Sequence, residues 1–168
     1  MSSSTIMNIF RFILLLALQV IILSRLNLFD FLNPYPYILY ILLYPVNGNK
    51  AGLLLSSFLL GLMVDMFTDS GGVHATACVT LAYLRPTFFK FAFGLSYEYQ
   101  TVKINERLSP ERFSFILISI VTHHLILYLL EVFKFSGILM VLTRTLFTTL
   151  FTLTLSIIII YLIKPGKQ

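Results

Sequence analysis

The sequence has few charged residues. They make up 11% of the 168 residues, whereas hydrophobic residues make up 58%. A soluble globular domain carries about 25% charged residues. Such a composition cannot cover a water-soluble surface, so we predict an all-α integral membrane protein that forms a single polytopic membrane domain over residues 1–168.

Cysteine and catalytic motifs are equally sparse. The one cysteine, Cys78, lies in an apolar run, so no internal disulfide can form and a buried small side chain is the expected role. The chain contains no G-x-S-x-G, H-E-x-x-H or Walker A motif. Asp65-x-x-x-Asp69 resembles half of the metal motif of CDP-alcohol phosphotransferases, but no Asp-Gly-x-x-Ala-Arg element precedes it. We therefore expect no enzymatic activity, no cofactor and no metal.

Long hydrophobic runs are what the sequence does contain. A hydrocarbon core of about 30 Å requires roughly 20 helical residues. On this measure we predict six membrane spans, at about 7–24, 35–46, 50–68, 72–84 (or to 93), 112–133 and 138–163. The first run is longer than the apolar region of a typical signal peptide, and no small-x-small cleavage site follows it. We therefore expect it to remain as a span.

The second predicted span is the shortest. Pro34 and Pro36 place its start and Pro45 its end, because proline is tolerated in the first turn of a helix and breaks its interior. The remaining dozen residues cover roughly 18 Å, so they either cross a locally thinned membrane or form a re-entrant segment. The charge pattern favours a crossing. Four tyrosines in this segment are typical of membrane-interface aromatics: Tyr35, Tyr37, Tyr40 and Tyr44.

The charges indicate an orientation. With six spans and a cytoplasmic N-terminus, nine basic residues lie on the inner side and three on the outer side, which is a positive-inside bias. The inner set is Arg11, Lys50, Arg85, Lys90, Lys103, Arg107, Arg112, Lys164 and Lys167, and the outer set is Arg25, Lys134 and Arg144. The long loop Gly94–Glu111 is then cytoplasmic.

Before this loop, Phe88–Phe93 either continues the fourth span beyond a kink at Pro86 or forms an in-plane interfacial helix. The net charge of +5 reports this asymmetry, and we expect no nucleic-acid partner.

The stretch Gly52–Pro86 holds most of the sequence-specific information. Gly61 and Asp65 lie four residues apart and share a helix face, and small residues on such a face favour close helix contacts. The short break at 68–72 makes the third and fourth spans antiparallel neighbours, so His74 could lie close to Asp65. For Asp65 the sequence leaves three roles open: a solvated interfacial group, a hydrogen-bond acceptor that fixes the fold, or a transport or catalytic acid.

The fifth predicted span carries His123, His124, Tyr128 and Glu131. The last three share a face, but the adjacent histidines point about 100° apart and cannot both bind one metal as an H-x-x-x-H pair would. We expect an interhelical or interfacial polar contact there rather than a metal site.

The sixth predicted span carries a stripe of hydroxyl groups. Its members are Thr145, Thr149, Thr152 and Ser156, with Thr143, Thr148 and Thr154 nearby. Such hydroxyls can bond back to their own helix. The stripe predicts a helix–helix seam, with a substrate groove as the alternative.

One pattern resembles a known family. Gly61-Leu62-x-x-Asp65, a short break, and then Gly72-x-His74-Ala75 followed by a small-residue helix is similar to the rod shape-determining protein MreD family. The resemblance is sharpest over 52–84 and covers the rest of the chain as hydropathy. Ser70-Gly71-Gly72 departs from the Pro-Leu-Gly-like turn of many members. The resemblance implies a six-helix fold similar to the substrate-binding subunits of energy-coupling-factor transporters.

The resemblance also implies a function. It places the protein in the bacterial inner (cytoplasmic) membrane, with both termini cytoplasmic, as a non-catalytic component of the cell-elongation machinery. The implied partners are an MreC-like single-span protein and, indirectly, an MreB-like filament and the peptidoglycan synthases, with membrane lipid around the bundle. Gly61, Asp65, Gly72 and His74 are the expected structural or partner-contacting residues.

A second hypothesis is a small-molecule-binding membrane subunit of a vitamin-type transporter. Asp65, His74 or the hydroxyl stripe would then contact the ligand. The chain lacks the Ala-x-x-x-Ala helix-docking motif expected for the energy-coupling partner.

Overall fold

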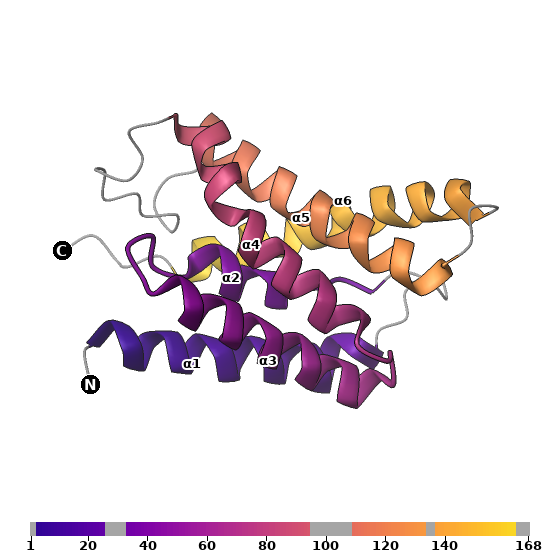
Figure 1. Cartoon of the computed structure of the whole chain (residues 1–168), viewed down its shortest axis with the longest axis horizontal. Coiled ribbons are helices and arrows are strands. Elements are labelled where there is room, and N and C mark those ends of the chain that lie inside the picture. Colours follow the sequence, from indigo (N-terminus) through magenta and orange to yellow (C-terminus); the bar gives the residue numbers. More distant parts are fainter. Residues whose placement is uncertain (1–2, 26–32, 95–108, 134–136, 164–168) are drawn as a thin grey trace.

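The computed structural model describes residues 3–25, 33–94, 109–133 and 137–163 (Figure 1). These residues form helices and loops without any strand. The elements are α1 (Ser3–Ala17), η1 (Leu18–Ile22), η2 (Leu23–Arg25), η3 (Pro36–Ile38), α2 (Leu39–Leu43), α3 (Lys50–Thr68), α4 (Val73–Phe93), α5 (Pro110–Val132) and α6 (Ile138–Leu162).

Local capping signals set the ends of the long helices. The Asn49 side chain accepts a hydrogen bond from the amide of Ala51 at 3.0 Å and so begins α3. Ser109 caps α5 in the same way, and Pro110 fills its first turn, where a missing amide proton costs nothing. At the other end of α3, Asp69 adopts a left-handed conformation (φ 53°) that stops the helix.

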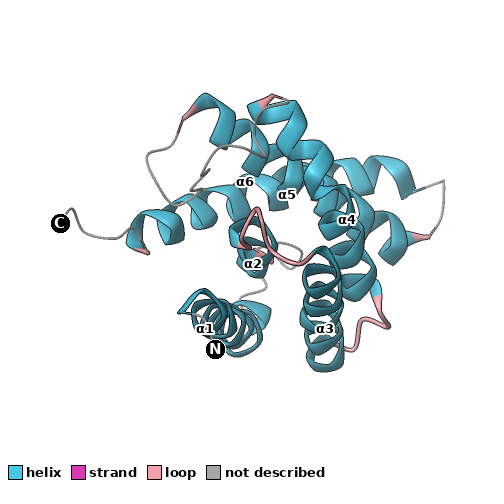
Figure 2. Cartoon of the chain, turned by 60° about the vertical axis from the view of Figure 1, so that its left-hand side comes forward, coloured by secondary structure: helices cyan, strands magenta, loops and turns pink. Residues whose placement is uncertain are grey.

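The long helices pack in sequence order. α3 lies against α4, α4 against α5 and α5 against α6, while α1 covers α2 and α3. In Figure 1 the start of α1, the end of α6 and the α2–α3 loop at 44–49 lie at one end of the molecule, which we call the loop end. The α3–α4 turn at 69–72 lies at the opposite end, the turn end. Figure 2 shows α2 above α1 and beside α3.

The short helical segment η3–α2 lies in the interior of the bundle. Tyr37, Leu39 and Leu42 have no exposed surface, and Tyr40 is 5% exposed. The prediction that Tyr37 and Tyr40 are membrane-interface aromatics is therefore wrong. They are buried because α1, α3, α4 and α6 all pack around this segment.

Four helices are long and apolar enough to cross a membrane: Thr5–Ile22, Lys50–Thr68, Pro110–Val132 and Ile138–Leu162. The predicted all-helical, multi-pass membrane class is therefore confirmed for the described residues. The two other predicted spans do not meet this standard. η3–α2 is too short, and α4 carries polar and charged side chains such as His74, Arg85 and Lys90.

The helix α4 continues through Pro86 to Phe93. This is the longer of the two predicted extents, and Phe88–Phe93 is therefore the end of α4 rather than a separate in-plane helix. Most of the predicted charged loop Gly94–Glu111 lies outside the described residues, as do Lys134, Lys164 and Lys167.

Many large apolar side chains lie on the outer surface of the bundle, and many polar side chains lie in its interior. Apolar side chains such as Ile13, Leu55 and Leu139 point outward and are 60%, 62% and 73% exposed. The interior has an apolar region, where Phe89 and Phe115 stack with ring centroids 4.2 Å apart, but it also encloses histidines and hydroxyl groups. An apolar outer surface is suited to lipid, because lipid tails need no polar partner.

Candidate functional site

The carboxylate of Asp65, in the last turn of α3, caps the start of α4. Its Oδ1 accepts a hydrogen bond from the His74 amide at 3.0 Å, and its Oδ2 accepts one from the Ala75 amide at 2.8 Å. The Ser70 hydroxyl also donates to Oδ1, at 2.5 Å. The first amides of a helix have no partner within it, and Gly72, at the N-cap, offers no side chain. Asp65 supplies the missing acceptor, with a negative charge that the helix N-terminus favours.

This geometry distinguishes among the three roles left open for Asp65. The side chain is 5% exposed, so it is not a solvated interfacial group. Both oxygens are used by backbone or hydroxyl donors of the neighbouring helix and turn. The contacts are those of a hydrogen-bond acceptor that fixes α3 against α4.

Gly61 lies one turn before Asp65, where α3 meets the backbone of α4. A Cβ atom at Gly61 would lie 2.5 Å from the Ala75 Cα and 2.6 Å from the His74 carbonyl oxygen. Both are backbone atoms and cannot rotate away. The missing side chain therefore lets the two helices approach closely enough for Asp65 to reach the start of α4.

Gly72 completes the connection. Its φ of 94° lies in the left-handed region that favours glycine, so the chain can reverse within a few residues. The structure thus brings together all four residues singled out in the sequence. We call Gly61, Asp65, Gly72 and His74 the α3–α4 joint.

The His74 side chain links the joint to the centre of the bundle. The Tyr37 hydroxyl lies 2.7 Å from His74 Nδ1 and 3.1 Å from His123 Nε2. A phenol has one proton, so Tyr37 donates to one ring and accepts an N–H from the other. Cys78 Sγ lies 3.8 Å from the same His123 nitrogen. One buried hydroxyl therefore connects η3, α4 and α5.

Two further contacts join α5 to α6. His124 Nδ1 lies 3.1 Å from Thr149 Oγ1, and the Tyr128 hydroxyl lies 2.7 Å from Thr148 Oγ1. All four residues are buried. This part of the hydroxyl stripe forms the helix–helix seam that the sequence predicts.

The stripe also reaches the interior segment before η3. The backbone amide of Tyr35 donates to Thr152 Oγ1 at 3.0 Å. By contrast, Thr143 and Thr154 are exposed and bond back to their own helix, to the carbonyls of Leu139 and Leu150 at 2.9 Å each. Thr148, Thr149 and Thr152 therefore form interhelical hydrogen bonds, whereas Thr143 and Thr154 face outward. The hydroxyls of Thr145 and Ser156 are buried but have no hydrogen-bond partner among the described residues.

Glu131 does not continue the buried face of His124 and Tyr128. It is 49% exposed and forms an ion pair with Arg144 at 3.2 Å. Its position in the last turn of α5 explains the difference, because the helix leaves the bundle interior there.

Tyr37, His74, His123 and His124 form what we call the histidine cluster. Two of its ring nitrogens are buried and have no hydrogen-bond partner among the described residues: His123 Nδ1 and His124 Nε2. Within the same residues, no group of three or more His, Cys, Asp or Glu side chains is arranged to hold a metal ion. The cluster is suited to hydrogen bonding between helices, or to a small polar molecule.

Sequence reasoning missed two residues, Tyr37 and Arg85. The role of Tyr37 depends on contacts with residues 37 and 86 positions away in the chain, and no local signal predicts them. Arg85 is 4% exposed, lies 4.8 Å over the Phe89 ring and donates to the carbonyls of Leu42, at 3.3 Å, and Tyr44. The available signal was an arginine inside an apolar run, which in a membrane bundle usually faces protein.

Comparisons of the chain with protein-family models, with curated proteins and with solved structures gave no match.

Proposed function

We propose that this protein is a non-catalytic membrane component of the bacterial cell-elongation machinery, as its resemblance to the MreD family implies. In this role it binds an MreC-like single-span protein and so links an MreB-like filament to peptidoglycan synthesis. The observation that supports the proposal is the α3–α4 joint. Of the motif residues that carry the resemblance, Gly61 and Asp65 contact the backbone at the start of α4, including His74, and Gly72 forms the turn between the two helices, as a shared structural motif would require.

The proposed topology has six crossings, with both termini in the cytoplasm of a bacterial inner-membrane protein. Its support is the charge distribution between the two ends of the bundle. On the side of the loop end, Lys50 and Arg85 lie beside the α2–α3 loop, and Arg11 donates to the Leu43 carbonyl at the end of α2. Lys90 lies in the last turn of α4 and Arg112 in the first turn of α5, with Glu111 as the one acid on this side among the described residues. The opposite side carries Asp65 and Asp69 at the end of α3, Glu131 in the last turn of α5 with its ion-pair partner Arg144, and Arg25 at the end of η2. Basic residues accumulate on the cytoplasmic side of membrane proteins.

A hollow between α1 and α3 is the proposed contact site for the partner's membrane helix. It has a volume of about 280 Å³, and α2 forms its floor through Tyr40. Gly52 and Ser56 line it from α3, and Asn8 lines it from α1. Small residues four apart allow helix backbones to approach closely, and an amide side chain can form an interhelical hydrogen bond. These are the features that a single-span apolar helix needs.

Native co-purification tests this function. The protein is tagged at its C-terminus, extracted in mild detergent and analysed by mass spectrometry for bound proteins. We expect a single-span coiled-coil protein together with cell-wall synthases. Recovery of ATPase subunits with a coupling membrane protein would contradict the proposal and favour the transporter hypothesis.

A substitution in the hollow sharpens the test. Ser56→Phe should reduce recovery of the single-span partner at least about fivefold, because the ring fills the space between α1 and α3. Leu55→Phe is the matched control, since Leu55 is 62% exposed and does not line the hollow. Both variants should reach the membrane in normal amounts. Equal partner recovery from the two variants would refute the proposed contact site.

The second candidate function is a small-molecule-binding subunit of a vitamin-type transporter, with the related six-helix fold. The observation that favours it is the pair of buried, unpartnered ring nitrogens of His123 and His124 within the described residues. Its test is direct binding of vitamin-sized molecules to the purified protein. Tight binding that His124→Leu abolishes would favour this function.

A further inference from the structure

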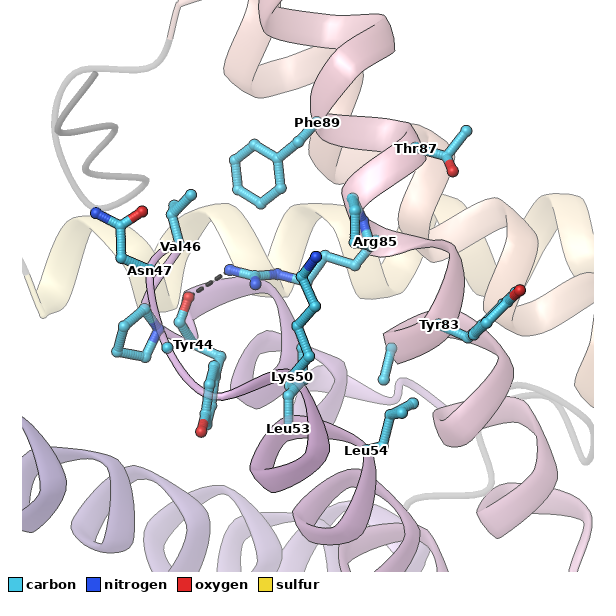
Figure 3. Close-up of a pocket in the computed structure, with 14 residues that line it drawn as sticks. Tyr44, Val46, Asn47, Lys50, Leu53, Leu54, Tyr83, Arg85, Thr87 and Phe89 are labelled. Atoms are coloured by element: carbon cyan, nitrogen blue, oxygen red, sulfur yellow. Dashed lines mark hydrogen bonds between the residues drawn. The ribbon is translucent and has the colours of Figure 1, made fainter. Parts of the chain in front are cut away.

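A cavity of about 690 Å³ lies at the loop end, away from the α3–α4 joint (Figure 3). The α2–α3 loop forms one wall, the first turns of α3 form another, and α4 between Ala82 and Phe89 closes it. None of the residues that line it belongs to the histidine cluster. The cavity is thus a separate feature of the fold.

Two cations from different helices line this cavity. Arg85 extends from α4 towards the α2–α3 loop, where its guanidinium donates to the Tyr44 carbonyl (Figure 3). Lys50 extends from the first turn of α3 into the same space. Arg85 is held in place by its carbonyl contacts and the Phe89 ring, whereas Lys50 is exposed and can adjust. Guanidinium and ammonium groups are the side chains that most often bind phosphate.

The remaining lining is divided between polar and apolar groups. Asn47 and Thr87 provide an amide and a hydroxyl, which can donate further hydrogen bonds to an anion. Leu53, Leu54 and the Tyr83 ring provide apolar surface on the side that leads between α3 and α4. A molecule with an anionic head and an apolar body matches this lining.

The depth of the cavity matches the position of lipid headgroups. Lys50 is the first residue of an apolar helix long enough to span the membrane, so its ammonium lies where that span ends. Basic pockets between helices at this level are suited to anionic lipid headgroups. A soluble ligand could enter as well, because the α2–α3 loop borders the cavity.

We propose that this cavity is a binding site for a phosphate-bearing anion, with Lys50 and Arg85 as its charged contacts and a lipid headgroup as the favoured source. The site requires only that the protein lie in a membrane, so it does not depend on the proposed cell-elongation function. Lipid binding reports on the site and partner co-purification reports on the function. The failure of one is therefore distinguishable from the failure of the other.

Native mass spectrometry of the purified full chain in detergent tests the site. The protein is titrated with phosphatidylglycerol and, separately, with phosphatidylcholine, whose headgroup has no net charge. We expect one phosphatidylglycerol molecule to bind more tightly than phosphatidylcholine. Lys50→Gln should weaken this binding about fivefold, the effect of removing one cation near an anionic headgroup. Lys50→Arg should restore it.

Lys90→Gln is the matched control, because Lys90 is exposed on the same helix as Arg85 but does not line the cavity. Its binding should equal that of the unmodified protein. Equal losses in Lys50→Gln and Lys90→Gln, or unchanged binding in Lys50→Gln, would overturn the proposal. A parallel arm adds inorganic phosphate at millimolar concentration. Displacement of the lipid supports the site with a soluble phosphate as its source, and persistence of the lipid supports a headgroup.

Discussion

Asp65 and Arg85 are buried charges near opposite ends of the molecule, and each binds the backbone at the end of a neighbouring helix. Asp65 accepts from the first amides of α4, while Arg85 donates to the last carbonyls around α2. These are the backbone groups that a helix cannot satisfy itself. Each charge also has the sign that the helix dipole favours at that end. In this membrane bundle, two buried charged side chains thus form hydrogen bonds to helix ends that water would otherwise form.

This role predicts the effect of substituting Asp65. Asp65→Leu leaves the amides of His74 and Ala75 and the Ser70 hydroxyl without their acceptor, which should lower the stability of the detergent-solubilised protein by about 3 kcal/mol. Asp65→Asn keeps one acceptor oxygen and should lose about 1 kcal/mol. Thermal unfolding of both variants checks this order. We also expect Asp65→Leu to reduce partner co-purification while membrane insertion persists. An Asp65→Leu variant as stable as the unmodified protein would show that the cap is dispensable.

At the scale of elements, the sequence predicts best where the signal is local. The starts of α3 and α5 follow from Asn49, Ser109 and Pro110, and each lies within about two residues of its predicted position. Where packing against neighbouring helices determines the local structure, prediction from the sequence fails. The end of the first helix changes to a π-helical turn that buries Gln19, and η3–α2 is enclosed on all sides. Neither outcome is encoded in the hydropathy of its own segment.

The candidate site follows the same rule. The α3–α4 joint spans only Gly61 to His74, so helix periodicity and a short break suffice to place its members together. The histidine cluster is different, because Tyr37 meets His123 from a distant part of the chain. Tertiary packing sets this contact, and the sequence of α5 alone carries no signal for it.

The seam between α5 and α6 provides the element-scale prediction. Tyr128→Phe, Thr148→Val and the double variant form a double-mutant cycle across one buried hydrogen bond of 2.7 Å. We expect a coupling free energy of about 0.6 kcal/mol, the average for such bonds between membrane helices. Equilibrium unfolding in detergent measures it. Thr143→Val serves as the control, since that hydroxyl is exposed and bonds to its own helix. Strictly additive effects of the two substitutions would show that the contact contributes nothing.

At the scale of the whole molecule, the outer surface is apolar, the interior is partly polar and the two ends differ in charge. The apolar surface places the bundle in lipid, because exposing it to water would be unfavourable. In the topology that we propose, the difference in charge between the ends sets its orientation. Since the start of α1 and the end of α6 both lie at the loop end, a single experiment on the α2–α3 loop fixes the side of both (Figure 1).

Cysteine accessibility provides that experiment. The native Cys78 is fully buried, so it should contribute little background labelling. Asn47→Cys and Thr68→Cys place one exposed thiol at the loop end and one at the turn end of α3. We expect a membrane-impermeant maleimide to label the Thr68→Cys thiol in intact spheroplasts and the Asn47→Cys thiol only after permeabilisation. The reverse pattern would invert the proposed topology and move the basic cavity to the outer leaflet. Labelling of both thiols from outside would mean that α3 does not cross the membrane. The proposal that the bundle spans the membrane with α3 as one of its crossings would then be refuted.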